Sequence, residues 1–203
     1  FFLRAAWTAT TGSLLLSGAP LNVLADSDDE ASSSTTIVEK GGAYTVPGAW
    51  DRAAPTRGFR DRFTGLDVAT RVSVIVTPTT LTSITDLGRA ENVVPATSLG
   101  LNPDLVRADM VAAAIRKQPG DKGTLVFYTW DLALTPQVCP PGDQFGGGVL
   151  GCSYDQIVLI SACISEGSLR TLVVEASAAE WKNHGIALRS LRDSFSAPRG
   201  GSG

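Results

Sequence analysis

Two apolar runs close to the C-terminal end constrain the fold of this chain most. They cover residues 157–165 and 169–176, and only Glu166, Gly167 and Ser168 separate them. Runs rich in β-branched residues favour strands, and a short loop that contains glycine allows one strand to turn back on the other. The sequence therefore predicts an antiparallel hairpin, which needs further strands or helices to cover its apolar side chains.

Three other segments have the pattern of strands. Val72 and Val74 alternate with Ser73 within residues 68–76, which is typical of a strand with one buried face. Residues 124–134 are rich in β-branched and aromatic side chains, and residues 44–47 predict a short edge strand that ends at its proline.

Two helices are predicted. Asn102 can cap a helix that Pro103 begins, and Val106, Met110 and Ala113 then recur at helical spacing as far as the Pro-Gly pair at 119–120. The second helix begins at Ser177, which forms a capping box with the glutamate three residues later. Its apolar stripe consists of Trp181, Leu188, Leu191 and Phe195. Strands and helices in separate stretches indicate an α+β fold.

Composition excludes several functions. The chain of 203 residues has 17 Lys and Arg against 20 Asp and Glu, and this balance does not suit a nucleic-acid-binding domain. His184 is the single histidine, so a multi-histidine metal site is excluded and any histidine-dependent catalysis must use this residue. We expect a structural histidine, no catalytic residue and no metal ligand; the alternative is an exported enzyme that uses His184 as its base.

Four parts of the chain differ in character. Residues 1–25 combine an early arginine, an apolar middle and a small-residue end, which predicts a targeting segment or, as an alternative, a retained anchor embedded in a membrane or partner. Residues 26–42 are acidic and rich in Ser and Thr, as in a solvated linker. The folded domain is expected at 43–196, and 197–203 as a flexible tail.

Cysteine spacing suggests one disulfide. Cys163 lies within an apolar strand, so of the three pairings that three cysteines allow we favour Cys139 with Cys152. An exported protein can keep such a bond, and a regulatory redox pair is the alternative.

Three blocks in order resemble the PsbP family of thylakoid lumen proteins. They are Tyr44-Thr-Val-Pro-Gly-Ala-Trp50, the segment RVSVIVTPTTLTSITDLG at 71–88, and the strand around Phe127 together with the ending SLRTLVVEASAAEWKNHGIALRSLRDSF. The resemblance implies an antiparallel sheet with helices packed on both faces, an α-β-α sandwich. The loop between Cys139 and Cys152 departs from the family pattern.

The resemblance also implies a function. Members are generally not enzymes and bind the lumenal face of photosystem II, where they support oxygen evolution and help to retain calcium and chloride. We therefore expect a peripheral protein of the chloroplast thylakoid lumen, without a cofactor of its own and with calcium bound only through the photosystem. A role with photosystem I or the NDH complex, as a subunit or assembly factor, is the alternative.

A local excess of arginine marks a candidate binding surface for such a partner. It consists of Arg52, Arg57, Arg60, Arg62 and Arg71, against three aspartates in the same segment. The guanidinium group of arginine binds carboxylates well, so acidic loops of a photosystem are the expected partners of this segment. The alternative is that the segment is an ordinary solvated surface.

Overall fold

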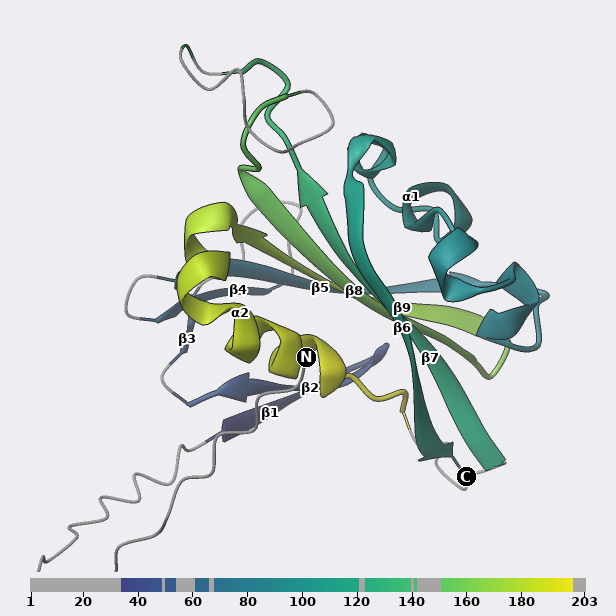
Figure 1. Ribbon diagram of the computed structural model, residues 1–203. Coiled ribbons are helices and arrows are strands. Elements are labelled where there is room, and N and C mark those ends of the chain that lie inside the picture. Colours follow the sequence, from purple (N-terminus) through teal and green to yellow (C-terminus); the bar gives the residue numbers. More distant parts are fainter. Residues whose placement is uncertain are drawn as a thin grey trace, which may run out of the picture. The chain divides into compact units, whose positions relative to one another are not determined.

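The computed structural model describes residues 34–48, 50–53, 61–65, 68–120, 123–139, 141 and 151–198, with the backbone alone at 51–53, 61–65, 68 and 69. In this part of the chain, seven antiparallel strands form the main sheet (Figure 1). Their order across the sheet is β3 (Asp51–Ala53), β4 (Asp61–Gly65), β5 (Val68–Pro78), β9 (Ser168–Ser177), β8 (Gln156–Ser165), β7 (Gly123–Leu134) and β6 (Asp109–Gly120).

The predicted hairpin is confirmed as β8 and β9. Ser165 lies opposite Ser168, so the connecting loop is Glu166 and Gly167 alone. Both residues have positive φ, 52° and 67°, which is the backbone conformation that suits a tight hairpin between twisted strands. The predicted strands at 68–76 and 124–134 are confirmed as β5 and β7, which pair with β9 and β8.

The folded region begins earlier than the expected boundary at residue 43. Residues 34–39, assigned to the linker, form β1 (Ser34–Glu39), which pairs with β2 (Gly42–Pro47) in a separate two-stranded sheet. The acidic and Ser/Thr-rich composition predicted a linker, although the segment also contains a run of β-branched residues, which favour a strand. One of them, Ile37, packs against the core. Ala197, from the expected tail, also packs there. The expected targeting segment, 1–25, lies outside the described residues.

The helix predicted after Asn102 is wrong. Asn102 does accept a hydrogen bond from the Asp104 amide, at 3.0 Å, but it caps only a short 3-10 turn, η3 (Pro103–Arg107). The chain then continues as strand β6, which pairs with β7 along its length, with an irregularity at Val111. Val111 is an extra residue in β6, which the pairing with β7 leaves out. It breaks the two-residue alternation of the strand and places apolar residues at helix-like spacing, which explains why the sequence pattern predicted a helix.

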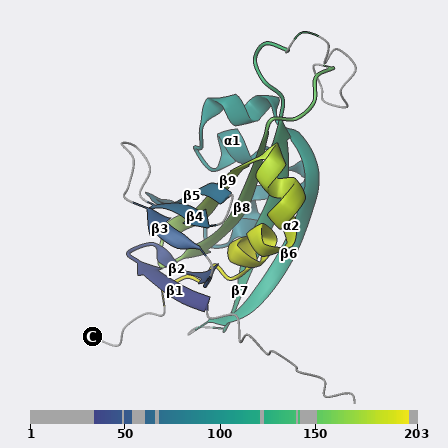
Figure 2. The same cartoon turned by 90° about the vertical axis from the view of Figure 1, so that its left-hand side faces the viewer.

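The predicted C-terminal helix is confirmed as α2 (Ala178–Asp193), including the Ser177–Glu180 capping box. It packs on one face of the sheet (Figure 2). We call the apolar layer beneath it the helix-side core; its fully buried members include Tyr44, Phe127, Leu159, Leu172, Leu188 and Phe195. The phenyl rings of Phe127 and Phe195 meet edge to face, with centroids 6.0 Å apart.

The opposite face of the sheet is covered by the segment between β5 and β6. This segment contains η1 (Ile84–Leu87), η2 (Ala90–Asn92), α1 (Pro95–Ser98) and η3, and its apolar side chains join Trp130 and Ile160 in what we call the turn-side core. The Trp130 indole donates to the Ala90 carbonyl at 2.8 Å, which fixes the segment to β7. The α+β antiparallel fold is confirmed, whereas the second face has short turns in place of an expected helical layer.

A buried carboxylate joins α2 to the sheet. Asp131, on β7, is 2% exposed and accepts a hydrogen bond from the Arg189 Nε at 2.8 Å and another from Arg192. Arg192 is itself buried and also bonds the carboxylate of Asp193. Both arginines lie outside the apolar stripe of the helix, and the structure shows that they bind a carboxylate of the sheet.

Replacing Asp131 with Ala should lower the free energy of unfolding by about 3–5 kcal/mol, because the buried Arg192 would lose its partner on β7. Urea unfolding followed by circular dichroism measures this loss. The exposed pair of Arg89 and Glu91 provides the control. Glu91→Ala is expected to cost at most about 1 kcal/mol. Equal losses in the two variants would contradict a structural role for the buried pair.

Candidate partner-binding surface

The strand register brings two of the candidate arginines together. Arg62, on β4, lies opposite Arg71, on β5, and Arg71 lies opposite Glu175, on β9. Arg52, on β3, is opposite Phe63 and so belongs to the next row of cross-strand pairs. Arg62, Arg71 and Glu175 therefore share one row of cross-strand positions, and a role of the two arginines in partner binding stays a prediction from the sequence.

The remaining candidate arginines, Arg57 and Arg60, lie outside the described residues. The chain on either side of them forms β3 and β4, which end one side of the sheet. Any contact that these two arginines make therefore stays a prediction from the sequence.

Glu175 gives the Arg62–Arg71 pair an unusual neighbour. Burial raises the pKa of this carboxyl, and the charge of Arg71 acts in the opposite direction. Its Oε2 is buried and has no hydrogen-bond partner among the described residues. Glu175 thus lies beside Arg71 in a buried setting that disfavours its ionised form.

His184 lies at a kink within α2, next to Trp50. Its backbone angles, φ −127° and ψ 16°, interrupt the regular helix, and its ring meets that of Trp50 edge to face at 6.4 Å. No group of three or more His, Cys, Asp or Glu residues suited to a metal ion occurs among the described residues. The neighbouring Trp181 stacks with the Arg189 guanidinium, 4.6 Å from its ring centroid.

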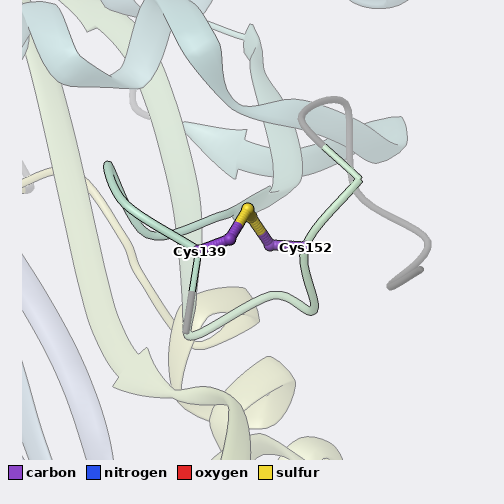
Figure 3. Close-up of a disulfide and its surroundings, with 2 residues drawn as sticks. All are labelled: Cys139 and Cys152. Carbon is purple, nitrogen blue, oxygen red and sulfur yellow. A yellow bond between two sulfur atoms is a disulfide. The ribbon is translucent and has the colours of Figure 1, made fainter. Parts of the chain in front are cut away.

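Cys139 and Cys152 are joined in a disulfide, the pairing that we favoured from the sequence (Figure 3). Their Cα atoms are 5.5 Å apart, within the usual range. The bond closes the base of the β7–β8 connection, where the Tyr154 hydroxyl donates to Asp109 at 2.6 Å. Cys163 is buried, and burial raises the pKa of its thiol to about 12, so this thiol stays protonated and unreactive.

These contacts predict a clear pattern of thiol reactivity. The native protein should show no fast-reacting thiol with a thiol-specific reagent, because Cys163 is buried and the other two cysteines are bonded. Denaturant alone should reveal one thiol, and denaturant with reductant should reveal three. Three reactive thiols in denaturant without reductant would contradict the disulfide.

The raised pKa of Glu175 predicts a pH-dependent effect on stability. Because the folded-state pKa lies above the unfolded-state value, ionised Glu175 destabilises the fold above that folded pKa, and the penalty disappears as the pH falls below about 4.3. Glu175→Gln should therefore raise the free energy of unfolding at about pH 8 and have little effect at about pH 4. Urea unfolding at both pH values tests this, and an equal effect at both would show that ionisation is not the cause.

No helix among the described residues is both long and apolar enough to cross a membrane. The nature of residues 1–25 stays a prediction from the sequence.

Comparison with known proteins assigns the family. The solution structure of cyanobacterial PsbP (CyanoP) from Synechocystis sp. PCC 6803 is similar, with a TM-score of 0.50 and 20% sequence identity over 89% of this chain and 98% of that chain. At this identity the likeness concerns the fold. No curated protein sequence matches significantly. A family model described as PsbP matches residues 38–197, which include β2, the whole main sheet and α2. The chain therefore belongs to the PsbP family.

Proposed function

We propose that this protein is a non-catalytic extrinsic subunit on the lumenal side of a photosystem, with photosystem II as the partner. The observation that carries the proposal is the family match over residues 38–197, since it covers the folded domain almost completely. The fold shared with cyanobacterial PsbP supports it. The expected location is the chloroplast thylakoid lumen, peripheral to the membrane.

The Arg62–Arg71 pair is the surface through which such a subunit would bind. Arg71 is exposed, and Arg62 lies opposite it in the register. Arginine at this position would attract acidic lumenal loops, accelerate association and fix the orientation of docking. The central strands hold this surface in place, because β5 pairs with β9 over eight residue pairs.

A subunit bound in this way would cover part of the lumenal side of the photosystem, and this cover would support oxygen evolution. Retention of calcium and chloride requires a barrier to exchange with the lumen, which a bound subunit supplies without being a ligand. We propose that calcium is bound only through the photosystem, as the resemblance to the family implies.

A partnership with photosystem I or the NDH complex is the second candidate, as a subunit or assembly factor. The disulfide-closed connection between β7 and β8 favours it, because this loop departs from the family pattern on which the photosystem II assignment depends. Comigration with one chlorophyll complex or another on a native gel separates the two candidates. A protein that runs free, with hydrolase activity lost in His184→Ala, would contradict both and favour the enzyme alternative.

The double variant Arg62→Glu/Arg71→Glu should bind isolated photosystem membranes roughly tenfold to a hundredfold more weakly, because like charges would then meet at the interface. Its binding should also lose most of its dependence on salt concentration. A cosedimentation assay over a range of salt concentrations measures both quantities.

The control is Arg89→Glu/Lys182→Glu, which changes the net charge equally at two exposed positions outside the β4–β5 pair. It should retain most of the affinity. If both double variants bind equally well, the Arg62–Arg71 pair is not the docking site, although the family-based function could still hold.

A further inference from the structure

The small sheet of β1 and β2 is attached to the fold without strand pairing to the main sheet. Among the described strands, β1 and β2 pair only with each other. Tyr44 and Val46 of β2 are nevertheless only 1% exposed, because their side chains enter the helix-side core. At the turn of the small sheet, Arg170 of β9 donates to the carbonyls of Lys40 and Gly41, and both distances are long, 3.4 Å. A two-stranded sheet by itself is only marginally stable in water, so other contacts must hold this one in place.

Residues 194–197, which follow α2 and which we call the C-terminal strap, supply these contacts. The strap runs along the edge of β2 that β1 leaves open (Figure 2). Ala43 and Ser196 exchange two backbone hydrogen bonds there, each 2.9 Å long. The Ser194 hydroxyl accepts another from the Thr45 amide at 2.8 Å. The strap therefore binds β2 as a neighbouring strand would.

The main sheet holds the strap from its other side. The side chain of Phe195 is fully buried and meets Phe127 of β7 edge to face. The carbonyl of Phe195 accepts a hydrogen bond from the Arg116 Nη2 of β6 at 2.7 Å. The strap therefore connects the small sheet to the main sheet, although neither strand of the small sheet pairs with the main sheet.

The fit between β2 and the strap is specific, because Gly42 leaves no room for a side chain. A Cβ atom at this position would lie 2.4 Å from the Ser196 carbonyl oxygen and 2.6 Å from the Phe195 ring, closer than a real Cβ atom approaches its neighbours. Any larger residue at position 42 would therefore push the strap and β2 apart.

We propose that β1 and β2 are ordered only while the C-terminal strap is bound to β2, and that the small sheet opens as a unit while the main sheet stays folded. Opening would uncover the part of the helix-side core that Tyr44 and Val46 cover. Units of this kind open at a lower free energy than the whole fold, and they often coincide with a supersecondary motif.

This coupling acts in both directions. A partner or protease that removes the strap also releases the small sheet, and a partner that draws β1 and β2 away also frees the strap. The contacts involve neither Arg62 nor Arg71, so the coupling does not depend on the proposed function, and its failure would leave that function untouched.

The first test is native-state hydrogen exchange. Ser194→Ala removes the acceptor of the Thr45 amide, so the other amides of β1 and β2 should exchange about tenfold faster, while those of β8 keep their rate. Gly42→Ala, which crowds the strap directly, should have the same selective effect. Ser98→Ala, at an exposed serine of α1, is the matched control and should leave β1 and β2 unchanged. The proposal fails if β8 accelerates to the same extent or if β1 and β2 do not respond.

The second test closes the contact covalently. Ala43 and Ser196 form a hydrogen-bonded antiparallel pair, in which Cα atoms are typically about 5.5 Å apart, a separation that a disulfide spans. In oxidised Ala43→Cys/Ser196→Cys the amides of β1 and β2 should exchange at least about tenfold more slowly, and reductant should restore the original rate. Wild-type protein with the same reductant controls for reduction of the native Cys139–Cys152 bond. Unchanged exchange in the cross-linked protein would show that the small sheet opens without the strap and would overturn the proposal.

Discussion

Burial of β7 and β8 on both faces of the main sheet is the constraint on which the rest of the structure depends. Trp130 on β7 and Ile160 on β8 are fully buried on one side, and Phe127 and Leu159 on the same strands are fully buried on the other. A sheet of this kind is stable only when a layer covers each face. The helix α2, which follows the last strand, supplies one layer, and the segment between β5 and β6 supplies the other, so the length of this connection has a structural reason.

Few polar groups fix these layers at specific positions. The carboxylate of Asp131 binds Arg189 and Arg192 of α2, and the indole of Trp130, the next residue to it, binds the Ala90 carbonyl on the opposite face. Neighbouring residues of one strand point to opposite faces, so this single step along β7 fixes both layers. The two edges of this sheet differ in length, since β3 has three residues and β6 has twelve.

The sequence predicted the elements whose signals are local. The capping box of Ser177 and the tight turn at Gly167 depend on residues close together in the chain, and both are present in the structure. The prediction for β6 was wrong because its extra residue at Val111 displaced the apolar pattern from a two-residue period. The Gly120 and Gly123 pair that closes the β6–β7 turn was a hairpin signal that could have corrected this interpretation.

By itself, the sequence determined the hairpin, the α+β class, the C-terminal helix and the resemblance to the PsbP family. These depend on the secondary-structure propensities of short segments and on the order of motifs, both of which can be read from the sequence. Tertiary structure alone decided that Arg62 lies opposite Arg71 in the strand register, that Arg192 is buried against Asp131, and that β6 is an edge of the sheet that the described strands form. Each of these facts depends on which strands are neighbours, and strand order is set by the packing of residues far apart in sequence.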